Sequence, residues 1–401
     1  MKNIAVIGAG ASGIMAALTA AEDKSNKVFL FERQARVGRK LAATGNGRCN
    51  LTNTGAALGN YHGRQPDFVV PALEAFPPRR VIELFEELGL VMTEQYGGRV
   101  YPLSDSANSV VDVLRFALEA RRVTLITAAE CTVGPGKGGG FTVKAGEEKY
   151  HCDKAIIACG GKAGGKLGGV SSGYDILRSF GHSLVPLYPA LVPIETDSDY
   201  PRSLKGIRAE AEIMLSRGGK EICRSRGEIQ FTDKGVSGPA AFDISREAST
   251  GGGDITINLA YMHSQEHIAR LLSARAEQQP EMECGSIFTG ILHSRLGLVI
   301  VKYCGLKPSA PAKTLSEKDI ARLAEGCMSF KLHVSGTGSF ENAQVTAGGI
   351  NTREFDPNTM QSRLVPGLYA CGEVLDIDGD CGGYNLQWAW ASGALAGRLG
   401  D

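Results

Sequence analysis

The chain has 401 residues, and 43 Lys and Arg residues balance 43 Asp and Glu residues, which gives a formal net charge of zero. This length predicts two or three domains, since roughly 100–200 residues per domain is usual. A chain without net charge lacks the field that attracts nucleic acid or an anionic membrane, so we expect neither as a partner. The 10 cysteines form no Cys-x-x-Cys pair, and no apolar window is long enough to span a membrane. We therefore expect reduced thiols and a cytoplasmic protein.

The N-terminal residues follow the pattern of a nucleotide-binding βαβ unit. An apolar run at 3–7 predicts a buried strand and leads into Gly8-Ala9-Gly10-Ala11-Ser12-Gly13, a G-x-G-x-x-G sequence. Residues 14–21 predict a helix, and a second predicted strand at 27–31 ends at Glu32. The glycines permit a tight turn, close approach to a pyrophosphate and close helix packing, and the acid accepts hydrogen bonds from ribose. This Rossmann pattern predicts a dinucleotide, but it fits FAD and NAD equally.

The next segment favours FAD. Residues 38–53 form a polar loop with three glycines, three asparagines and the cations Arg39, Lys40 and Arg48. A nicotinamide domain would normally continue with another plain βα unit, whereas this loop can surround a second phosphate and a polar ring edge. The alternative is a surface loop rich in turn-forming residues.

The middle of the chain has a different pattern. A predicted strand at 154–158 enters Cys159-Gly160-Gly161, and alternating residues in 191–258 predict antiparallel strands. We interpret Gly251-Gly252-Gly253 as a turn between strands. Apolar periodicity in 263–325 predicts helices. Two further patterns, H-x-x-E-H at 263–267 and G-x-S-x-G at 169–173, lack the context of a zinc site or a nucleophile elbow, so we predict no metal and no hydrolase.

A second glycine-rich site lies near the C-terminus. A predicted strand at 367–371 enters Gly372-Glu373, and Gly379, Gly382 and Gly383 precede a predicted helix at 384–395. If this helix N-terminus points at the pyrimidine edge of a flavin, its partial positive charge stabilises the negative charge of the reduced ring. The alternative is a buried C-terminal helix with a glycine-rich approach.

These blocks together resemble a family of bacterial flavoproteins, the aminoacetone-oxidase-like and bile-acid dehydro-steroid reductase-like NAD(P)/FAD-dependent oxidoreductases. The resemblance spans nearly the whole chain. It is carried by Gly8–Gly13, Gly38–Asn53, Phe231–Pro239, Ala347–Ile350 and Gly367–Gln387. Asp233 departs from the family pattern, where a histidine is expected, so no role is transferred to that position.

The resemblance implies an α/β fold with a discontinuous Rossmann-type FAD-binding domain of the glutathione-reductase-like family, formed by residues 1–190 and 340–401. An inserted substrate domain would comprise a β-barrel, from 191–260 and 327–339, and a helical subdomain at 261–326. Arg48, to hold a substrate carbonyl or carboxylate, and Tyr384, to donate a proton, are the predicted catalytic residues. The alternative for both is a role in flavin packing or in turn structure. The predicted FAD-binding residues are Gly8, Gly10, Ala11, Ser12, Gly13, Glu32, Arg33, Arg39, Lys40, Thr44, Gly45, Asn46, Gly47, Arg48, Cys49, Asn50, Cys131, Cys159, Gly160, Gly161, Gly372, Glu373, Asp380, Gly383, Tyr384, Asn385 and Leu386.

Three functions remain open on the sequence. The resemblance favours a reductase that passes hydride from flavin N5 to an activated C=C bond of a hydrophobic, steroid-like small molecule. The alternatives are a flavin oxidase of a small amine such as aminoacetone, and a non-catalytic flavin redox sensor. No second complete βαβ fingerprint is present, so NADH or NADPH is expected only as a transient electron donor. The oligomeric state stays open.

Overall fold

The computed structural model describes residues 1–400, which form two compact units, each with its own hydrophobic core. Unit 1 comprises Met1–Tyr188 together with the chain from Ala343 onward, and unit 2 comprises Pro189–Asn342. The chain leaves unit 1 and later returns to it, so unit 2 is an insertion in sequence. In the part of the chain that the structure describes, no helix is long and apolar enough to cross a bilayer.

Unit 1 is built on a parallel sheet of five strands in the order β20-β11-β1-β2-β7. These strands are Leu368–Ala370, Lys154–Ile157, Lys2–Ile7, Asn26–Phe31 and Thr124–Ile126, respectively. The inner strands are short apolar runs, as expected where both faces of a parallel sheet are covered. In register, Ile7 lies beside Phe31 on one side and Ile157 on the other. The carboxyl ends of the strands therefore meet at one edge.

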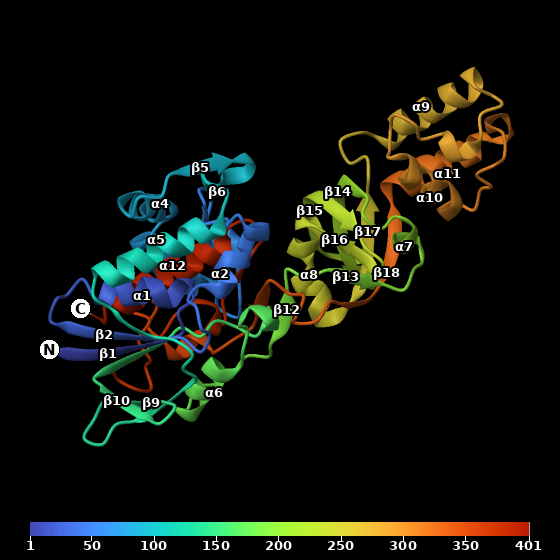
Figure 1. Cartoon of the computed structure of the whole chain (residues 1–401). Coiled ribbons are helices and arrows are strands. Elements are labelled where there is room, and N and C mark those ends of the chain that lie inside the picture. The colour runs from blue at the N-terminus through green and yellow to red at the C-terminus, as the bar shows by residue number, and fades with distance from the viewer. Residues whose placement is uncertain (401) are drawn as a thin grey trace. The chain divides into compact units, whose positions relative to one another are not determined.

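Three helices lie over this sheet, and two of them, α1 (Ala11–Ala20) and α12 (Tyr384–Gly397), are in close contact. Figure 1 shows α1, α12 and α5 (Ala107–Ala120) side by side over the sheet. The approach of α12 to α1 depends on glycine, because a Cβ at Gly393 would lie 2.4 Å from the Ser12 carbonyl oxygen. A Cβ at Gly397 would lie 2.6 Å from the Ala16 carbonyl oxygen. Small residues thus bring the N-terminal and C-terminal helices into backbone contact.

Smaller elements complete unit 1. An antiparallel sheet contains β8 (Cys131–Pro135), β9 (Phe141–Ala145) and β10 (Glu148–Cys152). A second contains β3 (Thr52–Asn53), β6 (Arg99–Pro102) and β5 (Met92–Gln95), and β4 (Tyr61–His62) pairs with β21 (Asp378–Gly379). The remaining elements are α2 (Arg39–Ala43), α3 (Val70–Ala75), α4 (Pro78–Glu87), α6 (Ser172–Ser179) and β19 (Val345–Ala347), and β12 (Tyr188–Ala190) crosses the boundary between the units.

Unit 2 contains a closed barrel with the strand order β13-β16-β15-β14-β17-β18. Its strands are β13 (Ile194–Thr196), β14 (Arg208–Arg217), β15 (Lys220–Phe231), β16 (Gly235–Ser237), β17 (Gly253–Asn258) and β18 (Phe330–Thr337). Alternate residues such as Ile213, Leu215, Ile255 and Ile257 are buried, as period-2 strands require. The helices are α7 (Tyr200–Ser203), α8 (Pro239–Gly251), α9 (Gln265–Gln278), α10 (Ser294–Tyr303) and α11 (Glu317–Met328), and the last three form a group (Figure 1).

The predicted fold class is confirmed, with a Rossmann-type α/β unit and an inserted barrel and helices. The interpretation of Gly251–Gly253 as a turn between strands is wrong, because α8 precedes it and only β17 follows. The helix begins with Pro239 at its first position, where the missing N–H costs nothing. Its buried residues Ala240, Ala241, Ile244 and Ala248 follow helical spacing. The interpretation of residues 191–258 as strands alone missed this helical periodicity.

Candidate functional site

The candidate site lies along the edge where the parallel strands of unit 1 end. Gly8 follows β1, Glu32 follows β2, Cys159 follows β11 and Cys371 follows β20. In open α/β sheets, ligands bind outside the carboxyl ends of the strands. Segments from the two ends of the chain thus meet at the position that this fold uses for binding.

The three fingerprint glycines occupy different environments. Gly8 has φ +104°, and a Cβ there would lie 2.5 Å from the Ala158 carbonyl oxygen. A Cβ at Gly13 would lie 1.8 Å from the Gly8 carbonyl oxygen, so this glycine permits the close contact between helix and strand. A Cβ at Gly10 would meet no atom within 4 Å. The backbone at Gly10 therefore faces open space, which suits close approach of a phosphate.

The N-terminus of α1 supplies donors to the same space. Its N-cap residue Gly10 makes no side-chain cap, and the first turn, which includes Ala11 and Ser12, contains no acidic residue. The Glu32 carboxylate accepts hydrogen bonds from the backbone N–H groups of Ala9, at 2.9 Å, and Gln34, at 2.8 Å. Each carboxylate oxygen keeps a second lone pair for a hydroxyl. The predicted ribose-binding acid thus also orders the turn after β1.

A partly buried ion pair connects α2 with the C-terminal block. Lys40 Nζ lies 2.7 Å from Glu373 Oε2, while Glu373 Oε1 accepts the Thr346 N–H at 2.8 Å. A Cβ at Gly161 would lie 2.5 Å from Glu373 Oε1, so glycine is required beside this carboxylate. Glycine is also required at position 372, because a Cβ there would lie 2.5 Å from Ser12 Oγ. The predicted residues Lys40, Gly161, Gly372 and Glu373 therefore lie in one group.

The polar loop has an unusual backbone. Gly45, Asn46, Gly47 and Cys49 all have positive φ, at 57°, 57°, 85° and 62°. The Cys49 N–H donates to the Thr44 carbonyl at 3.0 Å, which closes the loop on itself. Left-handed backbone at non-glycine residues is uncommon and concentrates at ligand-binding sites. The conformation favours a binding loop over an ordinary surface turn.

The loop docks against the C-terminal glycine-rich block. Thr52 Oγ1 donates to Gln387 Oε1 at 2.6 Å, and Trp390 Nε1 donates to the Leu51 carbonyl at 2.9 Å. Gly383, the N-cap of α12, has φ +103°, and a Cβ there would lie 2.6 Å from the Thr52 carbonyl oxygen. The polar loop at 38–53 and the C-terminal block at 367–387, which the sequence singled out, are therefore in direct contact.

These residues fit FAD. Asn50 Oδ1 is buried beside the N-terminus of α12 and has no hydrogen-bond partner among the described residues. A buried acceptor without a donor costs about 1–3 kcal/mol, and a ring N–H of a bound isoalloxazine would satisfy it. The uncapped N-termini of α1 and α12 suit the pyrophosphate and the pyrimidine edge, respectively.

Several predicted side chains are engaged in contacts of their own. Arg48 Nε lies 2.5 Å from Asp105 Oδ1, and its guanidinium stacks over the Tyr101 ring at 4.2 Å. The other contacts are Arg33 with the Gly168 carbonyl, Arg39 with Gln34, and Asn385 with both the N–H and the carbonyl of Gly379. Leu386 packs against the core of unit 1. Arg48 would have to leave Asp105 to bind a substrate carbonyl, so its catalytic role stays a prediction.

The predicted cysteines are buried or half-buried thiols. Burial raises the pKa of Cys49 and Cys159 to about 12, and that of Cys131 to about 11. The negative charge of Glu32 contributes to the raised pKa of both Cys131 and Cys159, after burial and, for Cys131, after Glu130. A thiol must ionise to act as a nucleophile. These three side chains can line the site but are poor nucleophiles.

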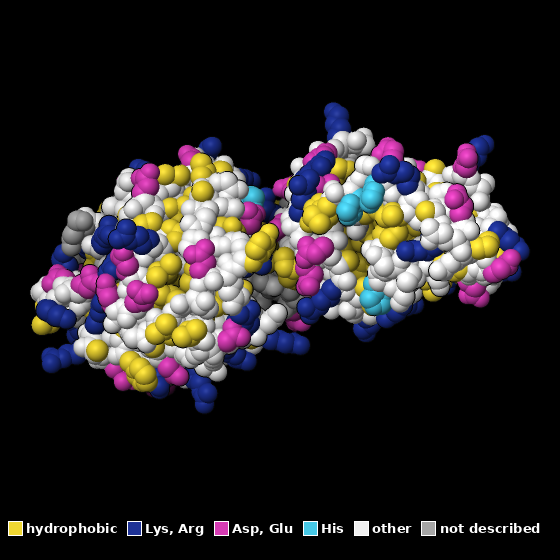
Figure 2. Space-filling model, turned by 90° about the horizontal axis from the view of Figure 1, so that it is seen from above, with side chains coloured by type: hydrophobic (Ala, Val, Ile, Leu, Met, Phe, Trp, Pro, Cys, Tyr) yellow, Lys and Arg dark blue, Asp and Glu magenta, His cyan; other side chains and the backbone are white. Residues whose placement is uncertain are grey.

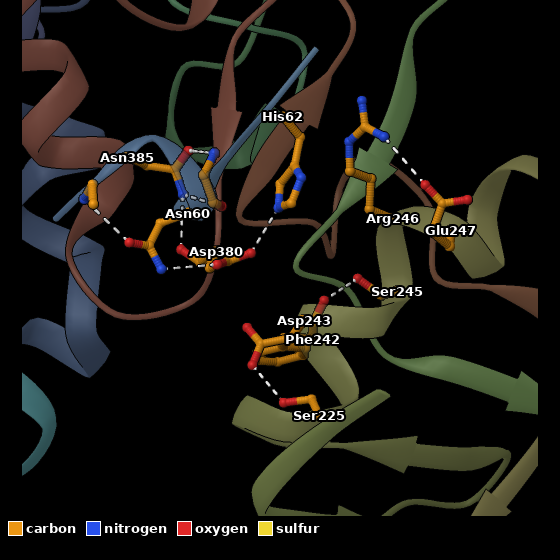
Figure 3. A network of polar contacts seen from close by, with 12 residues as sticks. Asn60, His62, Ser225, Phe242, Asp243, Ser245, Arg246, Glu247, Asp380 and Asn385 are labelled. Carbon is orange, nitrogen blue, oxygen red and sulfur yellow. Dashed lines mark hydrogen bonds and ion pairs between the residues drawn. The ribbon is translucent and has the colours of Figure 1, made fainter. Parts of the chain in front are cut away.

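A His–Asp pair that the sequence analysis missed lies next to the C-terminal block. His62 Nε2 lies 2.7 Å from Asp380 Oδ1, and Asn60 Nδ2 donates to Asp380 Oδ2 at 3.3 Å (Figure 3). Antiparallel pairing of β4 with β21 brings these segments together, with Tyr61 opposite Gly379. Asp380 was predicted to contact FAD, whereas no sequence feature connected it to His62, which is one of seven histidines.

Comparison with known proteins places this architecture in context. The family described as HI0933-like protein Rossmann domain matches residues 2–399. The chain is 37% identical over 404 residues to the 3-dehydro-bile acid delta(4,6)-reductase of Clostridium scindens, covering 99% of this chain and 98% of that protein. It is 31% identical over 389 residues to the ribosomal RNA dihydrouridine synthase of Escherichia coli, covering 96% and 95%. The solved 3-ketosteroid delta1-dehydrogenase from Sterolibacterium denitrificans aligns over 99% of both chains with a TM-score of 0.49 and 13% identity.

Proposed function

Because the chain belongs to the HI0933-like family and is an FAD-dependent oxidoreductase, we propose that it reduces a C=C bond conjugated to a carbonyl in a hydrophobic, steroid-like substrate. The observation that carries this proposal is the similarity to the bile-acid reductase along the whole chain. The name of the rRNA dihydrouridine synthase describes a similar reaction, because dihydrouridine forms when a C=C bond of uridine that is conjugated to a carbonyl is saturated. Two relatives with different substrates thus share one reaction class.

Different residues of the chain would serve different parts of such a reaction. When bound, FAD would supply the hydride for such a reaction. Lys40 and the N-terminus of α1 would hold its phosphates, and the N-terminus of α12 would stabilise negative charge on the ring edge. We propose NADH or NADPH as a transient donor that restores the reduced cofactor.

Charge on the barrel favours a small molecule over a nucleic acid as substrate. Several cations of the barrel lie beside carboxylates, among them Arg226 with Glu212 at 2.7 Å and Lys234 with Glu195 at 3.4 Å. Further pairs are Arg208–Glu228, Arg217–Glu247, Arg224–Glu221 and Lys205–Asp233. On the face seen in Figure 2, positive and negative side chains are interspersed. Binding to a phosphate backbone depends on cations that neutralise phosphates, and paired cations serve this poorly.

A second candidate is reduction of a uracil base in RNA, which the similarity to the Escherichia coli synthase favours. It requires the same hydride acceptor chemistry, since the uracil C=C bond is conjugated to a ring carbonyl. It differs in needing a surface for RNA.

A half-reaction assay tests the proposal. The purified holoenzyme is reduced anaerobically, then mixed with 3-oxo steroid dienes, simple enones or uridine-containing RNA, and flavin reoxidation is followed by stopped flow. In a separate arm, the oxidised holoenzyme is mixed with aminoacetone in the presence of oxygen and peroxide is measured. We expect rapid reoxidation by the steroid dienes and a product that has gained two hydrogens. Reoxidation by RNA alone would support the second candidate. Peroxide formation with amines, or no reoxidation by any compound, would overturn the proposal in favour of an oxidase or a redox sensor.

The electron donor is tested separately. Mixing the oxidised holoenzyme with NADH or NADPH without oxygen should bleach the flavin absorbance if either nucleotide serves as donor. Unchanged absorbance with both would remove the nicotinamide part of the proposal and leave the reductase part intact.

A further inference from the structure

We propose that Arg99 supplies a positive charge at the pyrimidine edge of the flavin, where it stabilises the negative charge of the reduced ring. The sequence analysis did not select this residue. The inference goes beyond the proposed function, because it concerns the reduced cofactor and holds whichever substrate the enzyme takes.

Arg99 lies on a strand that faces the C-terminal glycine-rich block. It belongs to β6, where it is paired with Asn53 of β3. Directly opposite residues of antiparallel strands project from the same face of a sheet. Asn53 Nδ2 donates to the Gly382 carbonyl at 3.0 Å, and Arg99 Nε lies 3.5 Å from the position that a Cβ on Gly382 would take. Both side chains are therefore directed at this block, and all of these residues belong to unit 1.

The guanidinium of Arg99 is half-buried and has no partner. It forms no hydrogen bond and no ion pair with any residue that the structure describes. The side-chain acceptors beside it in the ladder are engaged elsewhere, since Asn53 Oδ1 accepts the Gly55 N–H at 2.9 Å and Gln95 Oε1 accepts from Arg48 Nη2 at 3.2 Å. A partly desolvated cation without a counter-charge costs free energy. A ligand with negative charge would remove that cost.

Arg48, the arginine that the sequence predicted for catalysis, is in a different state. Its Nε lies 2.5 Å from Asp105 Oδ1, and its guanidinium stacks over the Tyr101 ring. Arg48 would have to give up this ion pair to bind a ligand, whereas Arg99 would give up none. Of these two arginines, Arg99 is therefore the better suited to hold a negative charge.

The position of Arg99 suits the pyrimidine edge of the ring. Gly382 directly precedes Gly383, the N-cap of α12. Asn50 Oδ1, the buried acceptor that a ring N–H would satisfy, lies 2.9 Å from the position of a Cβ on Gly383. In an isoalloxazine this N–H is bonded to the carbonyl carbon that shares the negative charge of the reduced ring with the next nitrogen. A cation beside the same pair of glycines would therefore meet that charge.

The expected effect differs between the two redox states of the cofactor. The oxidised ring is neutral at this edge, whereas a ring that has gained two electrons and one proton is an anion. A fixed positive charge therefore stabilises the reduced state and raises the reduction potential. The N-terminus of α12 contributes a partial charge equivalent to roughly +0.5, and Arg99 adds a full charge.

Redox titration of the holoenzyme without substrate tests the proposal. In Arg99→Gln we expect the two-electron midpoint potential to fall by about 30 mV or more, which corresponds to a tenfold or greater loss of preference for reduced over oxidised FAD. The Kd of oxidised FAD should stay within a few-fold of wild type. Arg99→Lys keeps the charge and should retain most of the wild-type potential. Arg79→Gln on α4 is the matched control, because the Arg79 side chain is 89% exposed.

Three outcomes would overturn the proposal. The first is an unchanged potential in Arg99→Gln, and a higher KM for an anionic substrate beside that unchanged potential would show that Arg99 contacts the substrate instead. The second is equal weakening of oxidised and reduced FAD, which would indicate a structural role. The third applies if Arg99→Gln does not fold, and it is the absorbance spectrum of a neutral reduced ring in the wild-type holoenzyme near neutral pH. The spectrum of the anionic ring would support the proposal.

The potential is measured without a substrate, so its result is independent of the proposed reaction. A fall in the potential of Arg99→Gln would support the role of Arg99 even if no enone reoxidised the wild-type enzyme. Reduction of enones by a variant with an unchanged potential would uphold the reductase and remove the role of Arg99.

Discussion

At the scale of single residues, the fingerprint glycines are required for different reasons. Gly13 is needed by the protein itself, because any side chain would overlap the Gly8 carbonyl oxygen. Gly10 has an ordinary backbone conformation, with φ −83°, and open space around its missing side chain. Only a ligand would occupy that space. The same motif thus contains one folding constraint and one binding constraint.

Substitution of these two glycines should separate the constraints. Gly10→Ala should leave the apoprotein stability within about 0.5 kcal/mol of wild type and lower FAD affinity at least tenfold. Gly13→Ala should destabilise the apoprotein by about 1–3 kcal/mol through overpacking. Denaturant unfolding of the apoprotein and FAD titration measure the two quantities. Normal FAD affinity in Gly10→Ala would show that the pyrophosphate lies elsewhere.

At the scale of elements, a buried histidine joins the end of α6 to two later segments of unit 1. His182 Nδ1 lies 2.9 Å from Glu354 Oε2, and its Nε2 lies 3.0 Å from Ser362 Oγ. Ser362 Oγ accepts N–H groups from Leu364 and Val365, so its hydrogen points to the imidazole. This arrangement resembles a hydrolytic triad, but the serine is only 4% exposed. The cluster is a structural link that requires a neutral histidine.

The link should make stability depend on pH. Burial lowers the pKa of His182 below its ordinary value of 6.5. The unfolded chain therefore binds a proton at a higher pH than the folded protein, and stability falls as pH drops through 6.5 toward the folded pKa. Thermal unfolding from about pH 7.5 to about pH 5.5 should show a smaller fall in His182→Gln than in wild type. The exposed His151→Gln should behave as wild type, and equal slopes in all three would contradict this account.

At the scale of the whole molecule, the two units have separate hydrophobic cores, so we expect bound FAD to stabilise unit 1 alone. The residues proposed to bind FAD all belong to unit 1, and so do both tryptophans, Trp388 and Trp390. Both tryptophans are buried in α12. Tryptophan fluorescence therefore reports unfolding of unit 1 alone.

Removal of FAD should lower the unfolding transition seen by tryptophan fluorescence. A ligand at 100 times its Kd stabilises the state that binds it by about 2.7 kcal/mol. Calorimetry should show a second transition, from unit 2, that does not move when FAD is added. A shift of both transitions by the same amount would show that the units unfold together.

The sequence by itself determined the local features of this protein, because they depend on neighbours in the chain. The order of strand, glycine turn, helix, strand and acid identified the nucleotide unit through Glu32, and the polar loop at 38–53 favoured FAD. The alternation of apolar and polar residues predicted the antiparallel strands of the inserted unit, although it missed α8. The pairing of His62 with Asp380, 318 residues apart, was decided only by tertiary structure. So was the contact of Thr52 with Gln387, because strand pairing and helix packing, which no single segment specifies, bring such residues together.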